Sequence, residues 1–555
     1  MNAAQLMEHF DRLAEAPDAV PRLRRFILNF AVRGKLVEQD AGDEPAATLL
    51  ERINAERTRL FKARKLKCIA KEAAKDESEL QLLLPKNWVL TQLGDVAQYG
   101  VADKVDSNSA IPSSTWVLDL EDIEKDTSRL LNHIESEARL FSSTKTAFKQ
   151  GDVLFGKLRP YLNNVIVADR DGVCTTEIIP IRGYCGLVPA YTKLVLRSPL
   201  TMLTVDRMMY GMKMPRLGTA DAAALSFPLP PLPEQHRIVA KVDELMTLCD
   251  QLEAAQQERE RRRDRLASAS LQRLNQPAVD ATPATQREHA RFHLHHLPCL
   301  TNRPEHIKAM RQTFFNLAVC GKLVDQESDD EPVAKLLKRS GVSIVNSRSD
   351  NNFHAIPPTW TWVTVDEIAS VTSGTTPSRE VAEYYSSNGT PWVTSGETSN
   401  PFITATTQHV TNKALKETSL KLYPPGTLIV AMYGQGKTRG QIAELSIAAT
   451  TNQACVAIVS KLEDQGHRRY VKLFFQKIYE EIRELAAGGA QPNLNGGKIK
   501  STLIPLPPLA EQYRIVAKVD ALMALCDQLE AQLTATQTDS RRLLEAVLEA
   551  ALAPA

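Results

Sequence analysis

Apolar residues recur in alternating steps of four and three along two long segments of the chain. They are Ile238, Val242, Leu245, Cys249 and Leu252 in the first segment, and Ile515, Val519, Leu522, Cys526 and Leu529 in the second. This spacing puts the apolar side chains of a helix on one stripe, which another helix has to cover. The pattern predicts two long helices whose stripes cover each other. The alternative is two surface helices that pack on separate cores.

The two helical segments belong to a near-copy within the chain. Residues 228–254, PLPPLPEQHRIVAKVDELMTLCDQLEA, recur at 505–531 as PLPPLAEQYRIVAKVDALMALCDQLEA, with 23 of 27 positions identical. The prolines before each helix cannot lie in a helix interior, because proline lacks the amide donor and clashes with the preceding turn. Each long helix therefore begins after a stiff, proline-rich exit from the segment before it.

The duplication extends to most of both halves. Residues 26–52 return at 314–339, and Pro85-Lys86-Asn87-Trp88 is echoed by Pro357-Pro358-Thr359-Trp360. Gly151-Asp152-Val153-Leu154 aligns with Gly426-Thr427-Leu428-Ile429, and Thr175-Thr176-Glu177 with Thr450-Thr451-Asn452. Each half runs from a helical segment through a divergent globular segment to a long helix. A shared frame that carries two different domains is the expected arrangement.

The divergent segments, near residues 85–227 and 357–504, have the pattern of mixed α/β domains. Short β-rich runs alternate with Gly, Asn and Pro turns. These runs are VLDL, DVLFGKL, NVIVAD and TKLVL in the first segment, and TLIVAMY and ACVAIVS in the second. A helical pattern appears at residues 473–485. The stretch at 275–303 reads as a solvated linker, although His293, His295 and His296 raise the alternative of a metal site.

Composition excludes several classes of protein. The formal net charge is +1, so any surface for nucleic acid has to be local. No apolar run has membrane-spanning length, and the first residues lack the pattern of a signal peptide. The eight cysteines form no CxxC pair, which is typical of reduced thiols in a cytoplasm. We therefore expect a cytoplasmic, multidomain protein without bound metal.

Polar and basic side chains gather in loops beside the expected strands, at aligned places in both halves. Arg and Lys can donate to guanine, Asn and Gln can pair with adenine, and all of them can contact phosphate. The candidate DNA-binding residues of the first half are Lys157, Arg159, Tyr161, Asn163, Asn164, Lys213 and Arg216. Those of the second half are Ser373, Thr375, Thr376, Ser378, Arg379, Tyr433, Gln435, Lys437, Arg439, Gln491, Asn493 and Asn495.

Residues 431–438, AMYGQGKT, fit a relaxed phosphate-loop pattern after an apolar run. A nucleotide site is the weaker interpretation, because the first position is Ala and the aligned stretch GKLRPYLN has no Gly-Lys-Thr. The sequence also lacks GxSxG, HExxH and a Gly-rich cofactor loop. We therefore expect a recognition protein rather than an enzyme, with no catalytic residue.

These motifs resemble the specificity subunits of type I restriction–modification systems. The resemblance rests on the duplicated PLPPLxEQxRIVxKVD, the AVRGKLV and AVCGKLV blocks, the PxxW entries, GDVLF with GTLIV, and TTNQA. It implies an α+β chain in which two mixed α/β target-recognition domains are separated by long helices, shared between the halves, that form an antiparallel coiled coil. The internal repeat would be pseudo-twofold.

The same resemblance implies a domain order and a set of partners. The domains would be a helical region at 1–84, recognition domain 1 at 85–232, a long helix at 233–275, a linker at 276–303, a second helical region at 304–350, recognition domain 2 at 351–509 and a C-terminal helix at 510–555. Each recognition domain would read half of a bipartite, asymmetric site on double-stranded DNA.

Partner subunits would perform the catalysis. Two methyltransferase subunits would use S-adenosylmethionine, and restriction subunits would use ATP and Mg²⁺, while this chain would bind no cofactor and no membrane. Three alternatives stay open from the sequence. They are a specificity chain for a fused methyltransferase–nuclease, a scaffold that does not bind DNA, and an enzyme with an unrecognised site.

Overall fold

A computed structural model describes most of the chain and divides it into two compact units. The described residues are 16, 18–63, 84–100, 103–106, 111–141, 143–211, 213–276, 283–342, 356–433, 438–487 and 494–552. One unit comprises the chain up to Arg259 together with the residues from Gln537 onward, and the other comprises Glu260–Thr536. Two long helices, α9 (Leu232–Asn275) and α18 (Leu509–Leu552), contribute residues to both units.

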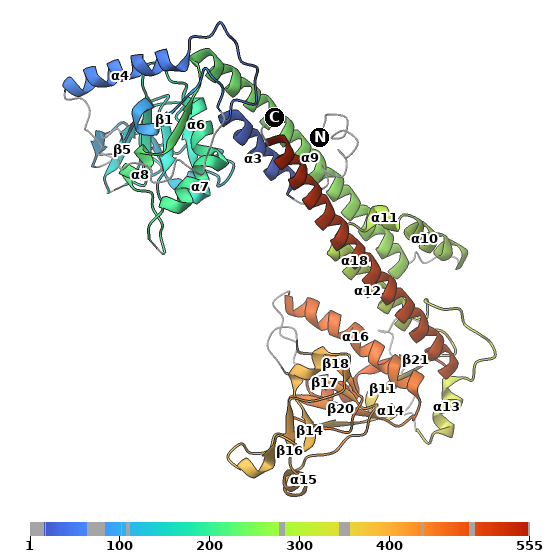
Figure 1. The fold of residues 1–555 in the computed structure, drawn as a ribbon. Helices are drawn as coiled ribbons and strands as arrows, with labels where there is room; N and C mark the ends of the chain where they lie inside the picture. Colours follow the sequence, from blue (N-terminus) through green and yellow to red (C-terminus); the bar gives the residue numbers. More distant parts are fainter. Residues whose placement is uncertain are drawn as a thin grey trace. The chain divides into compact units, whose positions relative to one another are not determined.

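The described residues of the first unit form three small sheets together with several helices (Figure 1). Its helices are α3 (Ala19–Val32), α4 (Ala46–Lys62), α5 (Leu93–Val96), α6 (Pro189–Arg197), α7 (Pro199–Met208) and α8 (Thr219–Ala223), with 3-10 turns η2 (Leu120–Asp122) and η3 (Pro160–Leu162). Its strands are β1 (Val89–Gln92), β2 (Ala97–Tyr99), β3 (Asp103–Val105), β4 (Trp116–Leu118), β5 (Lys145–Phe148), β6 (Val153–Gly156), β7 (Val165–Val167), β8 (Gly172–Thr175), β9 (Ile178–Gly183) and β10 (Ser226–Leu229).

The second unit repeats this plan with longer additions. Its helices are α10 (Pro283–His295), α11 (Leu297–Leu300), α12 (Pro304–Val319), α13 (Val333–Arg339), α14 (Val365–Ile368), α15 (Asn412–Glu417), α16 (Gln465–Ala487) and α17 (Gly496–Ser501), with η4 (Ala382–Tyr384) and η5 (Ser395–Ser399). Its strands are β11 (Thr361–Thr364), β12 (Ala369–Ser373), β13 (Tyr385–Ser386), β14 (Thr390–Val393), β15 (Phe402–Ile403), β16 (Gln408–Val410), β17 (Leu428–Ala431), β18 (Ile442–Leu445), β19 (Thr450–Thr451), β20 (Cys455–Ser460) and β21 (Leu503–Leu506).

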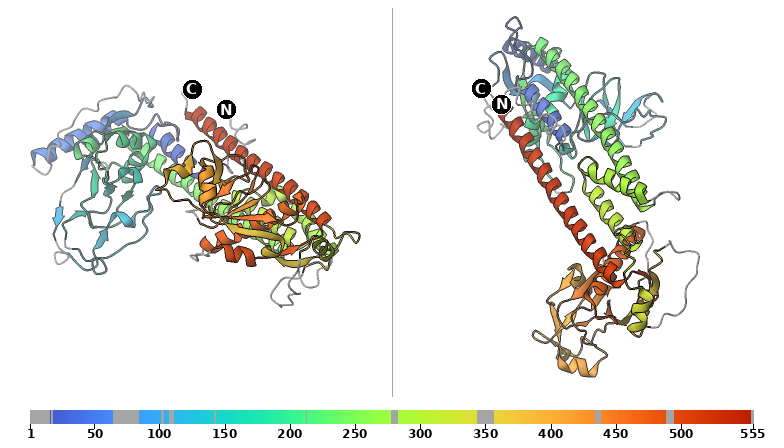
Figure 2. Two further views of the ribbon diagram at one scale, coloured as in Figure 1. Left: turned by 90° about the horizontal axis from the view of Figure 1, so that it is seen from below. Right: turned by 90° about the vertical axis from the view of Figure 1, so that its right-hand side faces the viewer.

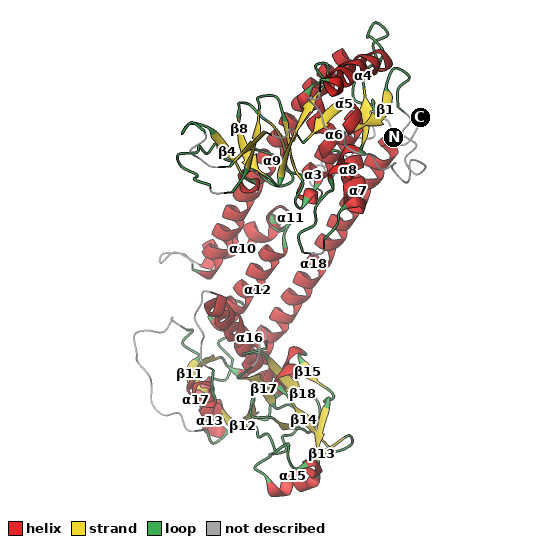
Figure 3. Cartoon of the chain, turned by 90° about the vertical axis from the view of Figure 1, so that its left-hand side faces the viewer, coloured by secondary structure: helices red, strands yellow, loops and turns green. Residues whose placement is uncertain are grey.

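One sheet has an equivalent strand order in the two units. The order β2-β9-β6-β7 in the first unit corresponds to β12-β20-β17-β18 in the second, where β15 adds a further edge strand. The other sheets are β3-β5-β8-β4 and β13-β16-β14-β19, and each contains one parallel pair, β4 with β8 and β14 with β19. Entry and exit strands pair antiparallel in both, β1 with β10 and β11 with β21 (Figure 3). Both divergent segments are therefore mixed α/β, as predicted.

One predicted strand is a helix. The run TKLVL lies inside α6, which begins at Pro189 and buries Tyr191, Leu194 and Val195. Tyr191 is three positions from Leu194 and four from Val195, so these side chains share one helical face. Proline is well tolerated in the first turn of a helix. A short apolar run cannot distinguish a strand from a buried helix by itself.

A buried carboxylate at the start of each long helix fastens three parts of its half together. Glu234 accepts hydrogen bonds from Trp88 Nε1 at 3.0 Å and from Gln39 Nε2 at 2.6 Å. One turn later, Arg237 Nη2 lies 2.6 Å from Asp43 Oδ2. The entry to the globular domain, the preceding helical region and the long helix thus meet at one point.

The second half repeats this arrangement atom for atom. Glu511 accepts from Trp360 Nε1 at 2.9 Å and from Gln326 Nε2 at 2.5 Å, and Arg514 Nη2 lies 2.6 Å from Asp330 Oδ2. The residues named in both halves come from the repeated sequence blocks. The internal repeat is therefore a repeat of contacts as well as of sequence.

The glycine of the AVRGKLV block is needed for this junction. Gly34 and its counterpart Gly321 have φ of 65° and 69°, a region that favours glycine. A Cβ at either position would lie 2.4 Å from the Cγ of Pro85 or Pro357, the prolines of the PxxW entries. The block and the entry therefore pack closely in both halves.

The prediction that the two apolar stripes cover each other is wrong. In the first unit, Ile238 and Val242 share a core with Ala31 of α3, and Arg24 of α3 binds Asp250 at 2.5 Å and Glu253 at 2.7 Å. The ribbon of α3 (blue) lies beside that of α9 (green) in Figure 2. Periodicity shows that a stripe needs a partner helix, and it does not say which helix that is.

In the second unit, α12 covers the stripe of α18. Cys526 packs with Ile307 and Met310 of α12, and Arg311 binds Asp527 at 2.7 Å and Glu530 at 3.0 Å. The last turns of α9 contribute Leu271 to the same cluster. The contact of α9 with this cluster thus uses residues beyond the predicted stripe.

The predicted linker at 276–303 is largely helical in its described part. Residues 283–295 form α10 and residues 297–300 form α11. His293 is 2% exposed, and its Nδ1 lies 2.9 Å from Ser270 Oγ on α9. Burial lowers the pKa of His293, which favours the neutral form of its imidazole. The ring therefore packs against the protein as a neutral side chain and is not solvated. Ala267 and Ser270 supply the small surface that α10 covers.

His467 gives the second unit a pH-dependent stability. Its Nδ1 lies 3.0 Å from Gln512 Oε1, and burial lowers its pKa to about 4. Because the unfolded chain binds this proton more readily, stability is expected to fall as the pH drops from about 6.5 to 4, by up to about 1.4 kcal/mol per pH unit. Urea unfolding of wild type and His467→Gln over this range measures the difference in slope.

The matched control is His236→Gln on α9, because His236 is exposed. The His236 variant is expected to keep the wild-type slope. An unchanged slope in His467→Gln would contradict the assignment of this dependence to His467.

Candidate nucleic-acid interface

Loop β6–β7 of the first unit holds the first group of predicted residues. Lys157 follows β6, Arg159 is exposed with a left-handed φ of 48°, and Tyr161 is 46% exposed. The backbone of this loop is fixed, since Arg159 N donates to Pro215 O at 2.8 Å and Leu217 N donates to Lys157 O at 3.1 Å. Three candidates from one loop therefore share a surface that is held in place by a second segment.

That second segment is a hairpin between α7 and α8 (Figure 1). Tyr210 N donates to Arg216 O at 3.1 Å, and Arg216 N donates to Tyr210 O at 2.9 Å. Gly211, with φ of 98°, begins the turn, and Lys213 is exposed near its tip. The structure thus places Lys213 and Arg216 in a segment that lies beside the loop of Arg159.

Sequence reasoning missed the apolar residues of this hairpin. Tyr210 is 59% exposed and Met214 is 49% exposed. The run Met208-Met-Tyr-Gly-Met-Lys-Met214 could have indicated an apolar surface from the sequence alone, because apolar residues around a glycine turn do not fit into a core. Such side chains can contact thymine methyl groups or base steps.

Arg216 is engaged by a carboxylate that was not among the candidates. Its Nε lies 3.1 Å from Glu177 Oε2, and its Nη2 lies 3.2 Å from Glu177 Oε1. The hydrogen bonds that Arg216 donates to Glu177 raise the pKa of its guanidinium. Lys157 N also donates to Glu177 O at 2.9 Å, so the turn that follows β8 belongs to the same surface.

Asn163 and Asn164 have structural positions in this loop. Asn164 is buried, and its O accepts from Gly156 N at 2.9 Å, which extends the β6–β7 pair. Asn163 has a left-handed φ of 57°, and its Nδ2 approaches Arg197 O at 3.5 Å. The Asn164 side chain is not accessible to a ligand, so its prediction as a DNA contact is wrong.

Two partly buried cations, Lys193 and Arg197, lie on the helix that packs against the loop. Burial lowers the pKa of Lys193 to about 8 and that of Arg197 to about 10. Arg197 Nη2 donates to Asp126 O at 2.9 Å. Both residues belong to α6, and the misassigned TKLVL run hid them from sequence analysis.

Loop β17–β18 is the counterpart of loop β6–β7 in the second unit. Ala431 N donates to Gln441 O at 3.0 Å, as Gly156 N does to Asn164 O, and Met432 N donates to Ala454 O at 2.8 Å. Tyr433 is 50% exposed, and Arg439 is partly exposed. Gln435 and Lys437 lie outside the described residues. The candidates that are described therefore occupy equivalent places in the two units.

The segment after β12 lies against the same end of the sheet. Thr375 N donates to Thr451 O at 3.0 Å, and Thr375 Oγ1 lies 2.9 Å from Ser419 Oγ. Thr376 Oγ1 accepts from Gln453 N at 3.4 Å. Ser378 Oγ accepts from the backbone of Glu380, and Arg379 is exposed. The structure thus brings this segment next to the Thr450–Gln453 turn.

Ser373 and Asn495 meet at the start of α17. A Cβ at Gly496 would lie 3.2 Å from Ser373 Oγ, and Asn495 Oδ1 accepts from Lys498 N at 2.9 Å as the helix cap. Asn495 is exposed, but its side-chain oxygen is already used. Gln491 and Asn493 lie outside the described residues.

The alignment of Thr175-Thr176 with Thr450-Thr451 is wrong in the structure. Strand β4 pairs Trp116 with Gly172 and Val117 with Val173, whereas β14 pairs Trp392 with Thr450 and Val393 with Thr451. The sheets therefore equate Thr450–Thr451 with Gly172–Val173. On the other side of the turn, Gly156 pairs with Ile178 and Ala431 with Cys455, which equates Glu177 with Ala454.

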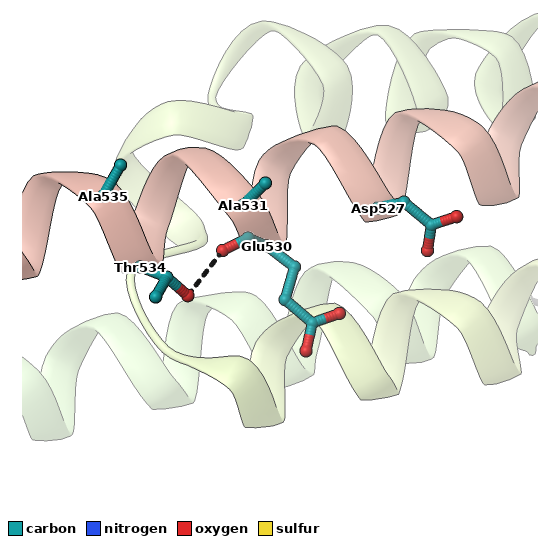
Figure 4. A pocket seen from close by; sticks show the side chains of 5 residues that line it. All are labelled: Asp527, Glu530, Ala531, Thr534 and Ala535. Carbon is teal, nitrogen blue, oxygen red and sulfur yellow. Dashed lines mark hydrogen bonds between the residues drawn. The ribbon is translucent and has the colours of Figure 1, made fainter.

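No alternative site competes with these loops in the described parts of the chain. Groups of three or more metal-ligating side chains are absent there, and the described helices include none that is long and apolar enough to cross a membrane. A hollow of about 550 Å³ is lined by Asp527, Glu530, Ala531, Thr534 and Ala535 of α18 (Figure 4). Arg311 already binds both of its carboxylates, and Thr534 Oγ1 donates to Glu530 O at 2.9 Å. This hollow is a flank of the helical frame.

Comparison with known proteins identifies relatives along nearly the whole chain. Residues 357–536 match the family model described as type I restriction modification DNA specificity domain. The specificity subunit of the type I restriction enzyme EcoEI from Escherichia coli is 28% identical over 96% of this chain and 94% of its own length. That of EcoAI, also from Escherichia coli, is 26% identical over the same shares.

A solved structure has the same fold. Its title is "Structural basis underlying complex assembly and conformational transition of the type I R-M system", and it covers 84% of this chain and 98% of its own with a TM-score of 0.50 and 20% identity. In each unit a buried glutamate joins the sheet domain to the start of a long helix, and the larger sheets of the two units have the same strand order. The relatives named above are specificity subunits. The chain thus contains a type I restriction modification DNA specificity domain at residues 357–536, and it is similar along nearly its whole length to specificity subunits of type I restriction enzymes.

Proposed function

We propose that this chain recognises a bipartite, asymmetric site on double-stranded DNA and directs methyltransferase and restriction subunits to it. The observation that carries the proposal is the equivalence of loops β6–β7 and β17–β18. Both follow equivalent sheet strands and carry an exposed tyrosine together with an arginine, which is exposed in the first loop and partly exposed in the second, yet their sequences differ. Two readers with one framework and different loops suit two different half-sites.

In this proposal residues 85–232 and 351–509 are the two recognition domains. The repeated Glu234 and Glu511 junctions support equivalent docking of two methyltransferase subunits, because a duplicated surface binds two copies of one partner. Methyl transfer from S-adenosylmethionine and ATP- and Mg²⁺-dependent restriction belong to the partners, so this chain is not catalytic. The long helices set the unread gap between the half-sites.

Matched loop variants test this function. Arg159→Ala is expected to relax recognition in one half-site, and Arg439→Ala in the other, each with a loss of about 1–3 kcal/mol at the affected position. The experiment maps methylated sites and measures binding to variant duplexes, with each variant assembled with its methyltransferase. The chain alone is expected to transfer no methyl group.

The two variants are controls for each other. If either variant degraded both half-sites equally, or if the wild-type complex showed no site preference, the assignment of these loops to sequence reading would be wrong. Methyl transfer by the purified chain alone would contradict its role as a recognition subunit.

A further inference from the structure

The ion pair between Glu177 and Arg216 sits within the candidate interface of the first unit. Arg216 presents its Nε and Nη2 side to the carboxylate, at 3.1 and 3.2 Å. The N–H groups of Nη1 and the second N–H of Nη2 are not directed at this carboxylate. They form the end of the guanidinium that can donate two hydrogen bonds to guanine O6 and N7. Glu177 therefore holds the guanidinium with its base-reading face directed away from the carboxylate.

Stabilisation of the fold does not explain this pair. The Glu177 and Arg216 side chains are 25% and 38% exposed. Ion pairs at such exposure contribute little to stability. A carboxylate beside Lys157, Arg159 and Lys213 also repels the phosphates of bound DNA. An unfavourable charge at a binding surface indicates a role in discrimination.

The comparison of the two units separates this pair from the framework. Framework contacts are repeated with identical residue types, as in the bonds of Trp88 and Trp360 to their carboxylates. The sheet register places Ala454 where Glu177 stands, so the second unit has no carboxylate at this position. In sequence, Asn493 replaces Arg216. The Glu177–Arg216 ion pair is therefore among the features that differ between the two recognition domains.

We propose that Glu177 is a positioning residue that directs Arg216 to a guanine and opposes binding to non-cognate DNA. The inference rests on the proposed function. On a cognate duplex, Arg216 donates to guanine while Glu177 still holds its Nε side. On other sequences, the Glu177 carboxylate reduces the gain that Arg216 would obtain from a phosphate, so non-specific binding is weaker than the loop cations alone would produce.

The test uses the full chain in complex with its methyltransferase. Glu177→Gln is expected to lower discrimination at one base pair of one half-site about tenfold, while binding to a non-specific duplex becomes tighter. The salt dependence of non-specific binding is expected to steepen by about one counterion, because Arg216 is released to phosphate. Arg216→Ala is expected to lower discrimination at the same base pair without making non-specific binding tighter.

A double variant separates positioning from a structural role. Glu177→Gln is expected to cause no further loss of base discrimination when Arg216 is already Ala. Glu121→Gln is the matched control, since Glu121 is an exposed carboxylate of the same domain that pairs with Arg139 at 3.4 Å. This variant is expected to leave both kinds of binding unchanged.

The outcomes distinguish this inference from the proposed function. A wild-type complex without any site preference would overturn the proposed function. Suppose instead that the wild-type complex prefers its site, and that Glu177→Gln weakens cognate and non-specific binding alike and lowers thermal stability. Glu177 would then have a structural role, and the inference would be overturned. Unchanged discrimination in Glu177→Gln would overturn it as well.

Discussion

Lengthening both long helices by one heptad is expected to widen the gap between the recognised half-sites by about three base pairs. Helix α9 passes from the first unit to the second at Arg259–Glu260, and α18 passes back at Thr536–Gln537. Seven residues inserted at each place add about 10 Å at 1.5 Å per residue, and each base pair occupies about 3.4 Å. Whole heptads keep the apolar faces nearly in register.

Affinity for the original gap is expected to fall roughly tenfold or more, because one half-site then lies out of reach of its reader. Three base pairs also turn the second half-site by about a third of a helical turn, so the new optimum binds less tightly than wild type. Methylome mapping of cells that express the variant with its methyltransferase measures the gap directly.

The control inserts the heptad in α9 alone. Such a chain is expected to lose cognate binding without gaining a new gap, since α9 and α18 no longer match in length. Altered half-site sequences with an unchanged gap in the doubly lengthened chain would contradict the role of these helices as the spacer.

Removing either buried junction carboxylate is expected to destabilise its half by about 2–4 kcal/mol. Glu234→Ala leaves the Trp88 indole without an acceptor and removes the shorter hydrogen bond of the Gln39 amide, and Glu511→Ala removes the acceptor of the Trp360 indole and of the Gln326 amide. Denaturant unfolding followed by tryptophan fluorescence measures the loss.

The Gln variants of the two carboxylates separate hydrogen bonding from charge. Gln keeps one acceptor oxygen, so the loss is expected to be smaller. Burial raises the pKa of both Glu234 and Glu511. The ionised form is thus less favourable in the folded chain, and these groups contribute less stability as the pH rises above about 4.5, a dependence that the Gln variants lack.

Glu244→Ala provides the matched control on the same helix. Glu244 is exposed and pairs only with its neighbour Lys241 at 2.9 Å, so a near-zero effect is expected. An equal loss from Glu244→Ala and Glu234→Ala would show that the junction carboxylates have no special role.

The sequence alone determined the repeat and the framework. The near-identity of residues 228–254 and 505–531 predicted two long helices, and both are present as α9 and α18. The aligned GDVLF and GTLIV runs became β6 and β17, so the loops that follow them occupy equivalent positions. Long periodic patterns and exact repeats are local properties of a chain, which explains why they could be read without a structure.

Only the tertiary structure decided which surfaces meet. The stripes of α9 and α18 are covered by α3 and α12, because complementarity between distant segments leaves no trace in the period of one helix. The register of β17 with β20, compared with that of β6 with β9, showed that Ala454, and not Asn452, stands in the place of Glu177. The Glu177–Arg216 pair joins residues 39 positions apart. Such contacts depend on how the chain folds back on itself, and no local pattern encodes them.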